Sequence, residues 1–164
     1  MLRDKNLIPL SRQHQHCLAL CVRLDRAIQA DDVDIEAWQA EIAQIFEQEV
    51  GVHFAAEEKE VFPRAAQVPE LQGLVRELLA EHEVLRGFFT GAGARSLDLA
   101  ALGEFGIKLA AHIRKEERQL FEGMQKSLGA EELGAMGVAL ELALAEAPQA
   151  CAVPSAATRL RGKQ

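Results

Sequence analysis

Residues 53–62 read HFAAEEKEVF, and residues 112–121 read HIRKEERQLF. Each stretch begins with a histidine, carries two adjacent glutamates, and ends in an aliphatic residue followed by phenylalanine. A further phenylalanine, Phe46 or Phe105, lies seven residues before each histidine, so the whole pattern recurs at an offset of 59 residues. One histidine with a glutamate four residues later would mean little in a glutamate-rich chain. Two copies in one frame indicate a duplicated helical unit.

Each copy places a histidine and a carboxylate on the same side of a helix. Residues at i and i+4 share one helix face, so His53 lies next to Glu57 and His112 lies next to Glu116. Paired inward Glu and His side chains on facing helices are how helix bundles build sites for two metal ions. The duplicated pattern therefore predicts that these four side chains serve one buried centre.

Two more histidines, His14 and His82, lie on the apolar stripes of two other predicted helices when residues are spaced by about 100°. The stripes comprise Leu10, Cys17, Cys21, Leu24 and Ile28 in one helix and Leu71, Val75, Leu78, Leu85 and Phe89 in the other. An unsatisfied buried polar group costs about 1–3 kcal/mol, and a metal would satisfy all four imidazoles at once. Nitrogen and carboxylate ligands suit iron, manganese or zinc. The predicted ligands are His14, His53, Glu57, His82, His112 and Glu116.

This ligand set leaves room for a small molecule. If each of two irons takes two histidines and both glutamates bridge, an oxo or hydroxo bridge fills further positions. One position on each iron would then accept water or a ligand such as O2, NO or peroxide.

The rest of the chain fits one all-α domain. Its 164 residues suit a single core, and its abundant alanine, leucine and glutamate favour helices. The net charge of −7 argues against a nucleic-acid partner. No apolar run approaches the length of about 20 residues that crosses a bilayer, and no secretion signal stands at Met1. Three cysteines without framework spacing fit a reducing cytoplasm.

Start and stop signals predict five helices. Asp34 is a good N-cap, Pro63 should end the helix that begins there, and Gly91–Gly93 should end the third. The helices are expected over about residues 9–30, 34–62, 69–89, 98–128 and 130–147. Short loops make the first four an antiparallel up-down-up-down four-helix bundle. The fifth should lie across one end or side, with dimerisation undecided. One domain would cover residues 1–147, followed by a disordered, flexible tail over 148–164.

Together these motifs resemble the hemerythrin-like cation-binding family, the HHE domain, over about residues 7 to 128. The resemblance is carried by Leu10-Ser11-Arg12-Gln13-His14, by the two repeated stretches, by Phe62-Pro63 and by Glu81-His82. It implies a four-helix bundle that holds a non-haem di-iron site. Oxygen-carrying hemerythrins have a second histidine where this chain has Arg86. The four-histidine, two-glutamate set looks more like iron–sulfur cluster repair proteins and iron-sensing hemerythrin domains of ubiquitin ligases.

Neighbouring polar residues have more than one interpretation. Glu58 and Glu117 point about 100° away from the ligand face, so they are solvated or hydrogen-bond the ligands. Glu49, four residues before His53, is either such a partner or a surface residue. His16 lies about 200° from His14 and is expected at the surface. Arg86 would pair with a carboxylate or close the ligand entrance.

Three functions remain open from the sequence. The first is a di-iron protein that binds or senses a small ligand or iron itself. The second is an enzyme or repair factor that acts on peroxide or damaged iron–sulfur clusters. The third is a metal-free helical adaptor with structural histidines. Cys17 and Cys21 are expected to be small buried hydrophobes, and the absence of tyrosine excludes a tyrosyl radical.

Overall fold

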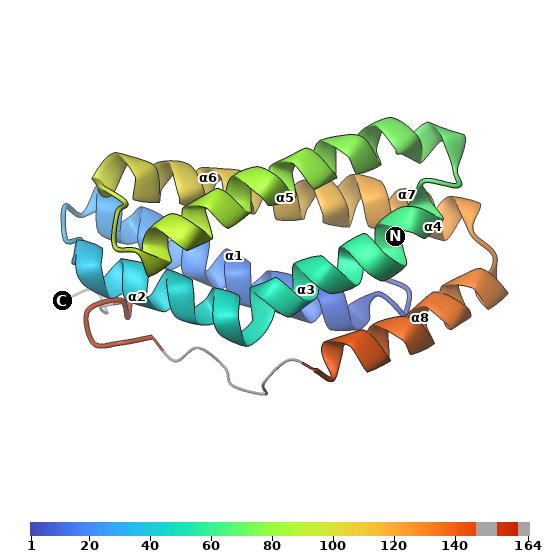
Figure 1. The fold of residues 1–164 in the computed structure, drawn as a ribbon, viewed down its shortest axis with the longest axis horizontal. Helices are drawn as coiled ribbons and strands as arrows, with labels where there is room; N and C mark the ends of the chain where they lie inside the picture. The colour runs from blue at the N-terminus through green and yellow to red at the C-terminus, as the bar shows by residue number, and fades with distance from the viewer. Residues whose placement is uncertain (147–153, 161–164) are drawn as a thin grey trace.

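Four helical rods run side by side in alternating directions in the computed structural model, which describes residues 1–146 and 154–160 (Figure 1). The first rod is α1 (Ile8–Gln29). The second rod joins α2 (Ile35–Ile45), η1 (Phe46–Val50), α3 (Gly51–Ala56), η2 (Glu57–Val61) and α4 (Phe62–Ala65). The third joins η3 (Pro69–Leu71) and α5 (Gln72–Gly93), and the fourth joins α6 (Leu99–Lys115), η4 (Glu116–Leu120) and α7 (Phe121–Ser127). A further helix, α8 (Ala130–Leu144), follows. The predicted all-α bundle is confirmed.

The rods begin where the sequence predicts, and the third also ends there. The side chains of Asp34 and Asp98 cap α2 and α6 by accepting backbone N–H groups at 2.9 and 2.8 Å. Gly91–Gly93, expected to end the third helix, forms the last residues of α5. The residue that takes the left-handed conformation after this helix is Arg95, with φ of 57°. There the Ser96 N–H donates to the Gly91 carbonyl at 2.9 Å, which closes the helix end.

Pro63 does not end the second rod, which continues to Ala65. The preceding segment η2 is a π turn, in which the Phe62 N–H donates to the Glu57 carbonyl five residues back. This change of hydrogen-bond pattern gives Pro63 a first-turn position in α4, where a missing N–H costs little. The predicted boundary at Pro63 is therefore wrong by two residues.

The core consists of two apolar clusters with a polar layer between them. The first core includes Leu20, Leu24, Trp38, Ile42, Phe89 and Phe105. The second core includes Leu10, Val61, Phe62, Leu78, Phe121 and Met136. On each rod a histidine lies at the boundary between the two cores. Helix α8 packs beside α3 and η2 and completes the second core. Within the described ranges, no helix combines the length and the apolarity that a membrane span requires.

Part of the C-terminal segment, which the sequence predicts to be a flexible tail over 148–164, lies within the described residues. Residues 147–153 and 161–164 lie outside the described residues. Residues 154–160 pass close to α2 (Figure 1), and Thr158 is 2 % exposed. The Arg23 guanidinium of α1 donates to the Thr158 carbonyl at 2.7 Å and also pairs with Glu41 of α2. The partly buried Arg23 thus ties this part of the segment to the bundle.

Candidate metal centre

The four buried histidines meet in two pairs. His14 of α1 and His53 of α3 form the first pair, and His82 of α5 and His112 of α6 form the second pair. Within each pair the two Nε2 atoms lie 3.1 Å apart. All four residues are at most 4 % exposed. The rods therefore bring together the histidines that the sequence singled out.

Glu57 and Glu116 lie between the two pairs, each at the start of a π turn. Glu57 places Oε1 3.1 Å from one Nε2 atom of the first pair and Oε2 3.5 Å from one of the second. Glu116 places Oε2 3.1 Å from the first pair and Oε1 3.3 Å from the second. Each carboxylate thus offers one oxygen to each histidine pair, as a bridging ligand would.

The outer ring nitrogen of every histidine has its own hydrogen-bond acceptor. In the first pair, Nδ1 of His14 donates to Glu117 and Nδ1 of His53 donates to Gln13, both at 2.7 Å. In the second pair, Nδ1 of His82 donates to Glu58 and Nδ1 of His112 donates to Glu81, both at 2.8 Å. Because these acceptors hold the N–H at Nδ1, the Nε2 atom of each ring faces the centre, where a neutral ring offers its lone pair to a metal. Hydrogen bonds of this kind fix the tautomer and orientation of metal-bound imidazoles.

These acceptors settle the alternatives that the sequence left open for Glu58 and Glu117. Both residues accept a hydrogen bond from a histidine, and each reaches across to a neighbouring rod. The sequence did not identify Gln13 and Glu81 as acceptors. A signal was present, because these two residues directly precede His14 and His82 in the two halves of the repeat.

Glu49 does not support a ligand histidine. Its carboxylate lies 3.0 Å from Nδ1 of His16, which is half-exposed as predicted. The four-residue count to His53 fails because η1 is a π turn, in which the Gly51 N–H donates to the Phe46 carbonyl. A π turn takes in an additional residue and rotates the preceding side chains relative to an α-helical count.

The electrostatics of the site follow from carboxylates buried beside imidazoles. Burial lowers the pKa of His14, but the neighbouring carboxylates, led by Glu116, outweigh it and raise the pKa to about 9. The same balance raises the pKa of His112 to about 10. Burial and Glu116 raise the pKa of Glu57, but the adjacent imidazoles outweigh them and lower it to about 2. The pKa of Glu116 falls well below its ordinary range, because the imidazoles outweigh its burial.

A metal fits this set of donor atoms. Among the described residues, no aligned hydrogen bond reaches any of the four carboxylate oxygens of Glu57 and Glu116, although all are buried. Two nitrogens bound at right angles to one ion, at about 2.1 Å each, lie about 3.0 Å apart, which matches the spacing within each pair. The donor atoms form two groups, and within each group all the atoms lie within 4.8 Å of one another. One group comprises His14, His53, Glu57 and Glu116, and the other comprises His82, His112 and Glu116.

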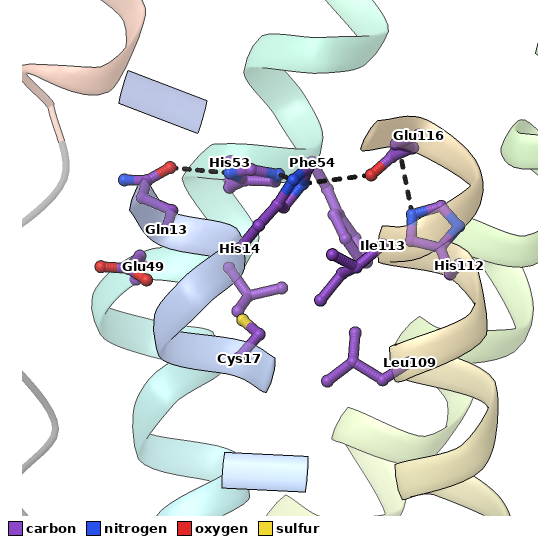
Figure 2. Close-up of a pocket in the computed structure, with 11 residues that line it drawn as sticks. Gln13, His14, Cys17, Glu49, His53, Phe54, Leu109, His112, Ile113 and Glu116 are labelled. Carbon is purple, nitrogen blue, oxygen red and sulfur yellow. Dashed lines mark hydrogen bonds and ion pairs between the residues drawn. The ribbon is translucent and has the colours of Figure 1, made fainter. Parts of the chain in front are cut away.

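A small cavity adjoins the first pair (Figure 2). Its volume of about 10 Å³ is about the room that one water molecule needs. Figure 2 shows Gln13 bound to His53 on one side, with Cys17 and Ile113 on the wall below the histidines. Glu49 also lines the cavity. The site therefore has space for a small ligand beside the first pair.

The remaining residues named from the sequence have structural roles. Cys17 and Cys21 are buried free thiols. Burial raises the pKa of both, that of Cys21 to about 12, so both stay neutral, as expected of small hydrophobes. Arg86 pairs with Glu58 at 2.8 Å and lies over the Phe54 ring. It therefore braces the carboxylate that accepts from His82.

The comparisons with known proteins agree with this geometry. The family model of the hemerythrin HHE cation binding domain matches residues 9–123, which is more than half of the chain. No curated protein matches the chain, and no solved structure does. The matched range includes both histidine pairs and both central glutamates, so the family and the buried cluster together indicate metal binding. This chain belongs to the hemerythrin HHE cation-binding family.

Proposed function

We propose that the chain binds two iron ions, one at each histidine pair, with Glu57 and Glu116 bridging them and an oxo or hydroxo group between them. One observation carries this proposal. Each carboxylate directs one oxygen to each pair, and these buried oxygens lack aligned hydrogen-bond donors among the described residues. Burying carboxylates without aligned hydrogen bonds costs free energy, which two cations would recover at once.

The surrounding side chains prepare the site for the ions. The four Nδ1 hydrogen bonds hold each imidazole with its Nε2 atom inward. Phe121 stacks on His14 with ring centroids 5.6 Å apart, and Phe62 lies against His82 at 5.2 Å. These rings and the two apolar cores keep bulk water from the ligands. Bound iron would supply coordination positions and a redox change that respond to O2, NO or peroxide.

The small cavity supports a function with a small ligand. It has room for about one water-sized group, which favours binding or sensing of a small ligand such as O2, NO or peroxide over a larger substrate. Sensing of iron itself would need only the metal positions. The cavity also admits peroxide as a substrate, so a peroxide-consuming enzyme is the second candidate. A cavity of about 10 Å³ does not fit an iron–sulfur cluster, so repair of damaged clusters is less favoured. The buried free thiols fit a reducing compartment such as the cytoplasm.

Metal analysis of the purified protein, with its optical spectrum, tests the proposal. After expression with ample iron we expect about two irons per chain and near-ultraviolet absorption from an oxo-bridged ferric pair. Loading the chelated protein with iron, manganese or zinc in parallel identifies the preferred ion. Turnover with peroxide, followed by loss of substrate, separates the enzyme from the binding protein. Less than about one transition metal per chain would support the metal-free adaptor instead.

A further inference from the structure

The polar support of the two histidine pairs is duplicated almost completely. Glu58 follows the ligand Glu57 and accepts from the second pair. Glu117 follows the ligand Glu116 and accepts from the first pair. Gln13, directly before His14, accepts a hydrogen bond from His53 of the first pair. Glu81, directly before His82, accepts one from His112 of the second pair. The half-repeats therefore build the same scaffold around both pairs.

This scaffold differs at one position. Gln13 accepts from the first pair through a neutral amide, whereas Glu81 accepts from the second pair through a carboxylate. The other two acceptors, Glu58 and Glu117, are carboxylates paired with Arg86 and Arg3. Glu81 likewise pairs with Lys115. The second pair thus has two anionic acceptors, and the first pair has only one.

An anionic acceptor makes an imidazole a stronger metal ligand. A carboxylate withdraws the Nδ1 proton more strongly than an amide does and so raises the electron density at Nε2. Loss of such an outer acceptor typically lowers metal affinity by about 10–100-fold. The pair supported by Gln13 should therefore hold its ion more weakly than the pair supported by Glu81.

The apolar wall differs in the same direction. Phe54 follows His53 and stacks on His82 with ring centroids 3.8 Å apart. Its counterpart after His112 is the smaller Ile113, and both Phe54 and Ile113 line the cavity. Three residues after His14 stands Cys17, another cavity residue, where the equivalent place after His82 holds a buried leucine. The cavity therefore touches both histidines of the first pair, which has the weaker acceptor, but only His112 of the second.

We infer that Gln13 and Glu81 make the two metal positions unequal. The first pair is the weakly held position beside the cavity, and the second pair is the position that fills first and empties last. This inference rests on the proposed function, because it requires two bound ions. It assigns Gln13 and Glu81 as positioning residues that act through the histidines they hold.

Anaerobic titration of the chelated full-length protein with ferrous ion, followed by calorimetry, measures the two positions separately. Wild type should bind in two steps whose affinities differ by about 10-fold or more. Gln13→Glu should strengthen the weak step, and Glu81→Gln should weaken the tight step, so either change brings the two steps together. The exchange variant Gln13→Glu with Glu81→Gln should restore two unequal steps in reverse order.

Removal of one ligand identifies which step belongs to which pair. His53→Ala should remove the weak step of wild type, and His112→Ala should remove the tight one. In the exchange variant these assignments should be reversed. Glu104→Gln, on the exposed face of α6, is the control for loss of a surface charge and should leave both steps unchanged.

The outcomes separate the inference from the proposed function. Absence of any ferrous binding contradicts the proposed function itself. Two steps of equal affinity in wild type overturn the inference alone, as do unequal steps that both single variants leave unchanged. If circular dichroism shows that Gln13→Glu does not fold, the titration of Glu81→Gln tests the inference instead. In that variant a tight step within about 3-fold of the wild-type value would contradict the role of Glu81.

Discussion

The two histidine pairs differ in how their rings are supported and resemble each other in the atoms that would touch a metal. Each pair presents two Nε2 atoms 3.1 Å apart, and each has one oxygen of Glu57 and one of Glu116 within 3.5 Å of an Nε2 atom. Only the first pair and both glutamates have all their donor atoms within 4.8 Å of one another. The residues around the rings differ. In the first pair His53 donates to Gln13 and both rings line a cavity, whereas in the second pair His112 donates to Glu81 and Phe54 stacks on His82. A duplicated bundle can thus keep its ligands alike and still make its two positions chemically distinct.

The largest effect should come from the residues that both pairs share. Glu57→Leu with Glu116→Leu should abolish metal binding at both positions, because each carboxylate serves both. Metal at 1,000 times its dissociation constant should stabilise wild type by about 4 kcal/mol and should not stabilise the variant. Thermal unfolding with and without ferrous ion checks this.

The same substitutions should cost the metal-free protein little at high pH. Near pH 10.5 His14 and His112 are mostly neutral, so the substitutions then remove two buried carboxylates that these imidazoles no longer balance, and the two apolar cores remain. At that pH we expect metal-free wild type and variant to differ by less than about 1 kcal/mol in unfolding free energy. At pH 7 the variant also loses the pairing of the two imidazolium groups and should be less stable than metal-free wild type. The control pair Glu47→Leu with Glu104→Leu, at exposed positions, should retain full metal binding. A variant that still gained stability from metal would refute a shared bridging role.

Removal of a single histidine should affect one pair at a time. His14→Ala should lose the ion of the first pair and retain most binding at the second, whereas His82→Ala should do the reverse. His16→Ala, two residues away but half-exposed, should change neither. Metal content per chain, measured after gel filtration, distinguishes these variants. Loss of metal in His16→Ala with full retention in His14→Ala would show that the assignment of α1 is wrong.

Each pair also contains one histidine with a raised pKa, which makes metal binding depend on pH. In the metal-free protein, protonated His14 and His112 contribute stability below their ordinary pKa of 6.5, and this contribution is lost as pH rises through about 9 and 10. The melting temperature of the metal-free protein should therefore fall between pH 7 and pH 10.5.

Metal binding requires neutral imidazole, so binding near pH 7.5 should release about one proton per position. Affinity should rise with pH over the same interval. Calorimetry in buffers of different ionisation enthalpy measures the number of protons released. Proton uptake on binding, or an affinity independent of pH between 7 and 9, would contradict the charge balance described for the site.

The smallest effect should come from the cations behind the acceptors. Arg3 pairs with Glu117 behind the first pair, and Arg86 pairs with Glu58 behind the second. Both ion pairs are partly exposed, and such pairs contribute about 0–1 kcal/mol. Arg3→Gln and Arg86→Gln should each weaken only the position that they support, by less than about 5-fold. Stepwise ferrous titration measures the change, and an equal loss at both positions would argue against separate supports.

The ligands could be predicted from the sequence because helical periodicity is regular and the His-x3-Glu pattern occurs twice. The N-cap at Asp34 could be predicted because it depends only on local side-chain chemistry. The π turns could not be predicted, because they depend on packing between rods. They carried the second rod past Pro63 and left the role of Glu49 open until the structure was known. The acceptors Gln13 and Glu81 reach across to other rods, so only the assembled bundle reveals which ring each one holds.

A crystal structure of the iron-loaded protein, with anomalous scattering recorded at the iron absorption edge, would locate the bound ions directly. Two anomalous peaks are expected. One should lie about 2.1 Å from the Nε2 atoms of the first pair and the other at the same distance from those of the second. Both should contact Glu57 and Glu116, and partial loading should leave the first-pair peak weaker. A single peak shared by all four histidines, or iron bound outside this layer, would contradict the account.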